Sequence, residues 1–282
     1  MRAELHCLSR SVGPEEPTGW ILILHGILGS GSNWGAFGRE LCERRPDFGV
    51  LIPDHRLHGK SGNGAPPDDV EACVLDLEKL ISVQSCPPSC VMGHSFGSKM
   101  ALELATRIPE IRQCIILDAD PAPLQMTGHS RKEFPVLLLM DALRNGPDIY
   151  LSREAFVEEL AQSGFRQGIA GWVGKNLKRV DGGLKLNLDL DRVESLLDDH
   201  HRLDYWPHID GCDLERIDFV VGARSNVVSD ESLLRMKTTA EKDPERSCFT
   251  SISEAGHWLH VDRPTELLEA LLPRLLDPEK SD

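Results

Sequence analysis

The chain has 282 residues, of which 40% are hydrophobic and 27% charged, which fits one α/β domain of a soluble globular protein carrying an inserted subdomain. Its formal net charge of −14 argues against nucleic acids and anionic membrane surfaces as partners, because both are recognised through basic patches. No apolar run approaches the roughly 20 residues that cross a bilayer, so we expect no stable membrane insertion.

The 8 cysteines are scattered along the chain and include no Cys-x-x-Cys pair. In a chain large enough to form its own core, this pattern predicts free thiols rather than a disulfide framework. It favours an intracellular, reducing compartment, either the cytoplasm or an organelle reached with a transit peptide that is later removed. The first residues lack the apolar segment of a secretory signal.

The first part of the chain alternates short apolar runs with helical patterns. The apolar runs are strands buried on both faces of a mostly parallel sheet, predicted at residues 20–24, 49–53, 89–92 and 114–117. Helices are predicted between them at 33–45, 70–81 and 98–105. This rhythm indicates right-handed βαβ units, whose ligands bind at the carboxyl ends of the strands.

Residues 124–210 break the rhythm and are predicted to be helical, at roughly 130–144, 152–163, 166–179 and 190–203. The rhythm returns with a strand pattern over 218–225, a helix at 230–242, a strand at 247–252 and an amphipathic helix after Pro264. We therefore predict an α/β core formed by residues 1–123 and 211–282. Residues 124–210 would form a helical lid, inserted before the last two strands.

Gly93-His94-Ser95-Phe96-Gly97 is a Gly-x-Ser-x-Gly motif at the junction of a predicted strand and helix. At such a junction the serine sits on a sharp turn, and the glycines remove the Cβ atoms that would collide as strand and helix pass. The N-terminus of the following helix points N–H groups towards negative charge that develops beside Ser95. The motif predicts a nucleophilic serine.

A serine nucleophile needs a base, a carboxylate that orients the base, and N–H donors for the oxyanion. We predict His257 as the base, on a loop after the last predicted strand, in preference to the nearby His260. The oxyanion hole is predicted to use the backbone N–H groups of Phe96 and Ile27, with Leu28 as a substitute for Ile27.

These motifs together resemble serine hydrolases with the α/β-hydrolase fold. The sequence is most similar to the branch of acyl esterases and thioesterases that contains YbfF-type esterases and eukaryotic abhydrolase-domain relatives. The matching segments are His25–Ser30 with Asn33-Trp34, a D-x-R-x-H-G-x-S pattern over Asp54–Ser61, Gly93–Gly97, Asp118–Pro121 and Gly256-His257.

The orienting acid departs from the pattern of many α/β-hydrolases. Ser225 and Asn226 stand where that acid commonly follows a later strand, and neither side chain carries a charge. The resemblance to the YbfF-type branch implies Asp118 instead. Asp120 and Asp230 are the alternatives, although Asp230 is expected to cap a helix.

Other polar residues have structural interpretations that we favour. The resemblance implies that Asp54, Arg56 and His58 brace the loop beside the oxyanion hole. The lid histidines His200, His201 and His208 lack a spaced carboxylate partner, so we predict no metal site and no cofactor. Trp34 and Trp258 could line an acyl pocket or belong to the core, and the sequence leaves both roles open.

The sequence therefore predicts a carboxylic-ester hydrolase that acts through a Ser95–His257–Asp118 triad and an acyl-enzyme. Its expected partner is a small-molecule ester or acyl substrate, with thioesters and lipid esters both open. The alternative is a receptor-like protein on the same fold that binds a small molecule with little turnover. The oligomeric state and the physiological substrate are not predicted.

Overall fold

A seven-stranded sheet forms the centre of the protein in the computed structural model, which describes residues 1–13, 16–124 and 134–278. The strand order is β1-β3-β2-β4-β5-β8-β9, with β1 antiparallel to β3 and the other neighbours parallel. The strands are β1 (Cys7–Arg10), β2 (Gly19–Leu24), β3 (Phe48–Pro53), β4 (Cys90–His94), β5 (Gln113–Leu117), β8 (Arg216–Gly222) and β9 (Ser247–Ile252). The predicted α/β-hydrolase architecture, a mostly parallel sheet flanked by helices, is confirmed.

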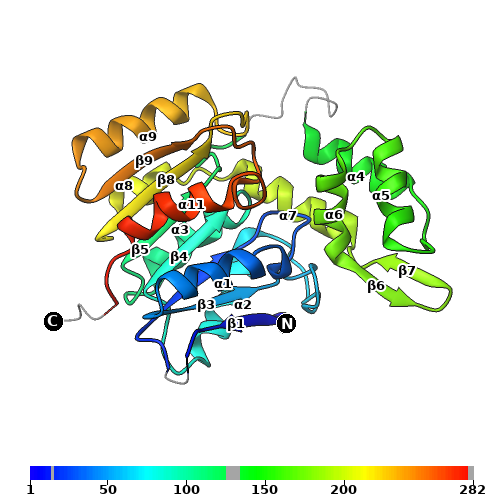
Figure 1. Ribbon diagram of the computed structural model, residues 1–282, viewed down its shortest axis with the longest axis horizontal. Helices are drawn as coiled ribbons and strands as arrows, with labels where there is room; N and C mark the ends of the chain where they lie inside the picture. The colour runs from blue at the N-terminus through cyan, green and yellow to red at the C-terminus, as the bar shows by residue number, and fades with distance from the viewer. Residues whose placement is uncertain (14–15, 125–133, 279–282) are drawn as a thin grey trace.

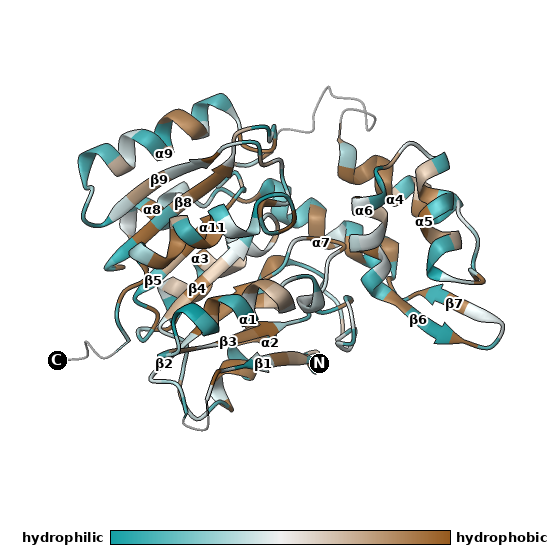
Figure 2. Cartoon of the chain, in the orientation of Figure 1, coloured by the Kyte–Doolittle hydropathy of each residue, from teal (hydrophilic) through white to brown (hydrophobic). Residues whose placement is uncertain are grey.

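Helices cover both faces of the sheet because its strands are apolar on both sides (Figures 1 and 2). In β2, Ile21 and Ile23 face one hydrophobic core and Leu22 and Leu24 face the other. The first core is closed by α1 (Gly35–Arg44), α10 (Leu259–Asp262) and α11 (Pro264–Leu271). The second is closed by α2 (Val70–Ser82), α3 (Gly97–Arg107), α8 (Trp206–Gly211) and α9 (Asp230–Lys242).

A smaller group of elements stands beside the sheet, between β5 and β8 in the chain (Figure 1). It comprises α4 (Pro135–Asn145), α5 (Arg153–Gln162), α6 (Gln167–Val173) and the strands β6 (Leu177–Val180) and β7 (Gly183–Leu186), and α7 (Leu190–Arg202) leads back to the core. We call residues 134–188 the insertion. The predicted start of its first helix, Ser130, lies outside the described residues.

The prediction of a helix over 166–179 is wrong beyond Val173. Residues 177–180 form β6, which pairs with β7 as an antiparallel hairpin around Asp181-Gly182-Gly183. Gly182 and Gly183 have φ of 83° and 153°, conformations that favour glycine and that a helix cannot contain. The hairpin was missed because its strands are short and half exposed, so they lack the apolar run of a buried strand.

Three smaller differences concern two short elements that were not predicted and the cap of one helix. Strand β1 was not predicted because it is a short, partly exposed edge strand, and the short α8 was not predicted either. Ser229, and not Asp230, caps α9, since its hydroxyl accepts the N–H of Ser232 while Asp230 is the first helical residue.

Within the described part of the chain, no helix combines the length and apolar character required to cross a membrane.

Candidate active site

Ser95 sits on the sharp turn between β4 and α3. Its φ of 53° is unusual for a residue with a side chain, and its N–H donates to the Leu117 carbonyl at the end of β5. A Cβ on Gly97 would lie 2.6 Å from the Leu24 carbonyl oxygen, and one on Gly93 2.5 Å from the Gly97 carbonyl oxygen. Both positions therefore require glycine, and the turn holds Ser95 at the carboxyl edge of the sheet.

His257 and Asp118 are joined by a hydrogen bond. The Nδ1 atom of His257 lies 2.7 Å from Oδ2 of Asp118, which is fully buried at the end of β5 with φ of 47°. The other carboxylate oxygen, Oδ1, accepts the Gly222 N–H at 2.8 Å. A buried carboxylate at Nδ1 fixes the tautomer of the imidazole, which leaves Nε2 free of the proton and able to accept one.

Ser225 also contacts the same carboxylate. Its hydroxyl donates to Asp118 Oδ2 at 2.5 Å, so three donors converge on the buried charge. The sequence placed Ser225 where many α/β-hydrolases carry the acid, and the structure brings that position against Asp118. Sequence reasoning did not find this contact, although the position itself was the available signal.

The alternative acids lie in other surroundings. Asp120 accepts the N–H groups of Ala122 and Ser229 and the hydroxyl of Ser232. It therefore fixes the start of α9 to the loop after β5. Asp230 opens the same helix. Neither residue bonds to His257 in the described part of the chain.

The Ser95 hydroxyl makes no hydrogen bond to His257 in the described residues, but the neighbouring residue His94 links the turn of Ser95 to His257. His94, the neighbour of Ser95, donates from Nε2 to the His257 carbonyl at 2.8 Å. A Cβ on Gly26 would lie 3.2 Å from the Ser95 Cβ, so the loop after β2 runs directly beside the serine. Burial lowers the pKa of His94 to about 3, which keeps the ring neutral. Catalytic hydrogen bonds often tighten only when substrate is bound.

The backbone N–H groups of Ile27 and Phe96 have no acceptor in the described part of the chain. Leu28 differs, because its N–H donates to Nε2 of His58 at 3.0 Å and its φ is 62°. Burial lowers the pKa of His58 to about 4, so the neutral ring can accept this bond. The Leu28 N–H is therefore occupied, which argues against Leu28 as the substitute donor.

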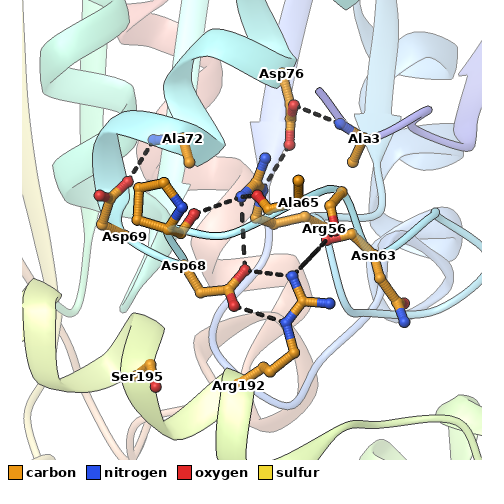
Figure 3. A network of polar contacts seen from close by, with 12 residues as sticks. Ala3, Arg56, Asn63, Ala65, Asp68, Asp69, Ala72, Asp76, Arg192 and Ser195 are labelled. Atoms are coloured by element: carbon orange, nitrogen blue, oxygen red, sulfur yellow. Dashed lines mark hydrogen bonds and ion pairs between the residues drawn. The ribbon is translucent and has the colours of Figure 1, made fainter. Parts of the chain in front are cut away.

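The D-x-R-x-H-G-x-S segment braces that loop. Asp54 accepts the N–H of Gly31 at 2.7 Å and that of Lys60 at 2.9 Å. Arg56 is buried and pairs with Asp76 at 2.7 Å, with Asp68 close by, as Figure 3 shows. These bonds confirm the structural interpretation of the segment.

The insertion reaches the same loop through two asparagines. The buried Asn176 donates to the Leu28 carbonyl and accepts the Gly59 N–H, both at 2.8 Å. Asn187 donates to the Gly59 carbonyl, also at 2.8 Å. Such contacts between distant segments leave no pattern in the sequence, and the prediction did not include them.

The two tryptophans that the sequence left open have different positions. Trp34 is fully buried and stacks on His260 with ring centroids 3.9 Å apart, so it belongs to the core. Trp258 makes an edge contact with Trp172 of the insertion, with the ring centroids 5.7 Å apart. The ring centroids of His200 and Phe96 lie 5.2 Å apart.

The described residues contain no group of three or more histidine, cysteine or acidic side chains that could hold a metal.

Comparison with known proteins gives one family. The alpha/beta hydrolase family matches residues 21–270 of the chain. The chain is 25% identical over 256 residues to the mouse sn-1-specific diacylglycerol lipase ABHD11, covering 89% of this chain and 79% of the relative. It is 26% identical over 257 residues to the Escherichia coli esterase YbfF, covering 91% and 93% of the two chains.

Solved structures share the fold. A marine microorganism esterase aligns with a TM-score of 0.76 at 24% identity, covering 96% of this chain and 99% of that one. The thioesterase domain from the curacin biosynthetic pathway aligns with a TM-score of 0.71 at 21% identity, covering 96% and 95%.

Proposed function

We propose, since the chain belongs to the alpha/beta hydrolase family, that it hydrolyses carboxylic esters through a serine acyl-enzyme. The coarser statement, that it is a carboxylic-ester hydrolase, follows from relatives that are named esterases and lipases. The finer proposal gives Ser95 the role of nucleophile, His257 that of general base and acid, and Asp118 that of orienting carboxylate. The observation that carries it is the 2.7 Å bond between His257 and the buried Asp118 at the strand ends beside Ser95.

The reaction has two halves. Ser95 Oγ attacks the ester carbonyl carbon while Nε2 of His257 takes the hydroxyl proton, and the same proton passes to the departing alkoxide as the ester bond breaks. Water then gives its proton to His257 and attacks the acyl-serine, which releases the acid and restores the hydroxyl. The negative oxygen of each tetrahedral intermediate would be held by the N–H groups of Ile27 and Phe96, for which the described residues offer no other acceptor.

We further propose that residues 124–210 act as a lid over this site and that thioesters and lipid esters belong to the substrate class. The contact of Trp172 in the insertion with Trp258 beside the base supports the lid, because it places apolar surface at the edge of the site. Relatives named for lipid-ester and ester hydrolysis support the substrate class.

Hydrolysis of a p-nitrophenyl ester series from acetate to palmitate tests the proposal. We expect turnover by the wild type, and its loss in Ser95→Ala with the fold retained by circular dichroism. Ser82→Ala, an exposed serine at the end of α2, is the matched control and should retain full activity. Activity of Ser95→Ala equal to that of the wild type would refute the assignment of Ser95 as the nucleophile. Folded wild type without turnover on any ester would favour the ligand-binding alternative.

A further inference from the structure

The segment that runs from the start of α6 into β7 concentrates positive charge in an acidic protein. Residues 166–185 contain five of the 31 basic residues and one of the 45 acidic residues, a formal charge of +4. The rest of the chain, with 26 basic and 44 acidic residues, carries −18. The net charge of −14 therefore hides a strong separation of charge along the chain.

The basic residues of this segment are exposed and have no acidic partner. Arg166, Lys175, Lys178, Arg179 and Lys185 are all exposed, and none forms an ion pair with a described residue. Arginines nearby in the chain behave differently: Arg144 pairs with Glu194 at 2.5 Å and Arg192 with Asp68 at 2.7 Å. The cations of the hairpin are therefore available to an outside anion.

Two of these lysines oppose each other directly. In the antiparallel register Lys178 lies across from Lys185, so both side chains project from the same face of the hairpin. Like charges at such positions destabilise a strand pair. An anionic surface laid against that face would relieve the repulsion.

Exposed apolar side chains lie beside the lysines. Tyr150 bridges to Leu184, which aligns residues 149–151 alongside β7. The Cγ2 atom of Ile149 lies 3.0 Å from the point that a Cβ on Gly183 would occupy, which puts Ile149 on the face of Lys185. Ile149 is 45% exposed and Leu151 88% exposed.

The other face of the hairpin has the same character. A hollow of about 420 Å³ is lined by Leu151, Arg153 and Arg179, with Glu154 the acidic residue in its wall. Figure 1 shows the hairpin of β6 and β7 at the outer end of the insertion, away from the seven-stranded sheet.

We propose that the face of the hairpin that carries Lys178, Lys185 and Ile149, with the exposed Leu151 beside it, docks the protein on an anionic lipid surface, and we call this face the hairpin patch. Lysine and arginine bind anionic headgroups, and adjacent leucine and isoleucine side chains enter the interface between headgroups and acyl chains. A nucleic acid fits less well, because the patch holds no aromatic side chain on which bases could stack. Salt screens charges beyond about 8 Å, so the hairpin binds the surface without repulsion from the distant acidic residues.

Co-sedimentation of the full chain with phosphatidylcholine vesicles, with and without phosphatidylserine, tests the proposal. We expect binding that requires phosphatidylserine and falls as sodium chloride is raised. Lys178→Glu should weaken it about fivefold or more, and Lys178→Glu with Lys185→Glu about 25-fold or more. Lys242→Glu, at the exposed end of α9, changes the net charge equally and should leave binding unchanged.

Folding of the variants is checked by two independent readouts. Lys178→Glu places opposite charges across the hairpin, so its melting temperature should equal or exceed that of the wild type. Hydrolysis of a soluble short-chain ester should stay unchanged, which separates docking from the proposed catalysis.

Four outcomes would overturn the docking proposal. Equal binding to both kinds of vesicle, or none to either, would remove its electrostatic basis. An equal loss in Lys242→Glu would assign the effect to net charge. Vesicle binding that Leu151→Ser leaves undiminished would exclude the insertion of apolar side chains into lipid, on which the proposal partly rests.

Discussion

At the residue scale, the two aspartates after β5 have separate tasks. Asp118 bonds to His257, whereas Asp120 holds the N-terminus of α9. We expect Asp118→Asn to lower kcat about 10⁴-fold, because the amide cannot stabilise an imidazolium or keep the tautomer. Asp120→Asn should leave kcat near the wild-type value and lower the free energy of unfolding by about 1–2 kcal/mol. Ester kinetics and urea unfolding of both variants check this, and the reverse pattern would exchange the two roles.

Ser225 supports the Asp118 charge through one hydrogen bond. A hydrogen bond to a charged group contributes about 1.5 kcal/mol, so Ser225→Ala should lower kcat on the order of tenfold. Ser225→Thr keeps the hydroxyl and should restore most of the rate. Steady-state kinetics with both variants give the comparison. An alanine variant as fast as the threonine variant would show that the two N–H donors suffice.

Much of the site could be predicted from local sequence. Ser95 lies inside a motif whose glycines are required by the backbone geometry of a few consecutive residues, so the pattern is visible in the chain itself. His257 lies on the loop after the last strand, where the fold collects polar groups, whereas Asp118 was preferred to Asp120 and Asp230 only through the resemblance to the YbfF-type branch. The Ser225 hydroxyl bonds across 107 positions of sequence, and such a contact depends on tertiary packing that no local pattern records.

At the scale of elements, the nucleophile helix α3 is tied to both ends of the segment that leaves and rejoins the core. Lys99 is 1% exposed, and its Nζ donates to the carbonyls of Ala122, His200 and Leu203. Ala122 lies just before the segment leaves, and the other two carbonyls lie at the end of α7. One buried ammonium group therefore joins three stretches of chain near Ser95.

This lysine gives the stability a specific pH dependence. Burial lowers the pKa of Lys99 from 10.5 to about 8, against the opposing effect of nearby aspartates. Between these values the unfolded chain binds the proton and the folded chain releases it, so the free energy of unfolding rises with pH, by on the order of 3 kcal/mol. Below about pH 8 both states are protonated and the cost of burying the charge is fully present.

Denaturant unfolding of the wild type and of Lys99→Met from pH 7 to pH 10.5 measures this contribution. Methionine does not titrate, and groups common to both proteins cancel in the difference. We expect the wild type to gain stability relative to the variant across this interval. Parallel curves would mean that Lys99 keeps an ordinary pKa in the folded protein.

Prediction of elements worked where one pattern extended over a whole segment. Helix α9 and strand β9 occur at their predicted bounds. In residues 166–179 a helical turn changes into a strand within a few positions, and the helical pattern was extended too far. The glycines at 182 and 183 were the signal that a turn follows.

At the scale of the whole molecule, the insertion helps to hold the loop that would bind the oxyanion. Asn176→Ala would leave the Gly59 N–H and the Leu28 carbonyl without their partner. We expect a loss of about 2–3 kcal/mol in the free energy of unfolding and a fall in kcat of about tenfold, because the Ile27 N–H shifts with Leu28. Asn145→Ala removes an exposed asparagine with one hydrogen bond in α4 and is the matched control. An unchanged kcat in Asn176→Ala would limit the residue to a structural role.

The average charge of the chain and the distribution of that charge lead to different expectations about partners. The value of −14 argues against anionic surfaces, whereas the segment 166–185 carries +4. A sum over the chain carries no spatial information, and a basic segment is compatible with an acidic total. Binding to phosphatidylserine vesicles distinguishes the two expectations.

The bonds of Asn176 also determine how this protein could be recombined. A chimaera that exchanged residues 134–188 for the corresponding segment of a relative would be designed to change substrate preference alone. Because Asn176 and Asn187 bond to Leu28 and Gly59 of the core, such an exchange would also alter the turnover number unless both amides were retained. We therefore expect an exchange of the insertion to change substrate preference and turnover number together. A set of chimaeras made from this protein should keep both asparagines.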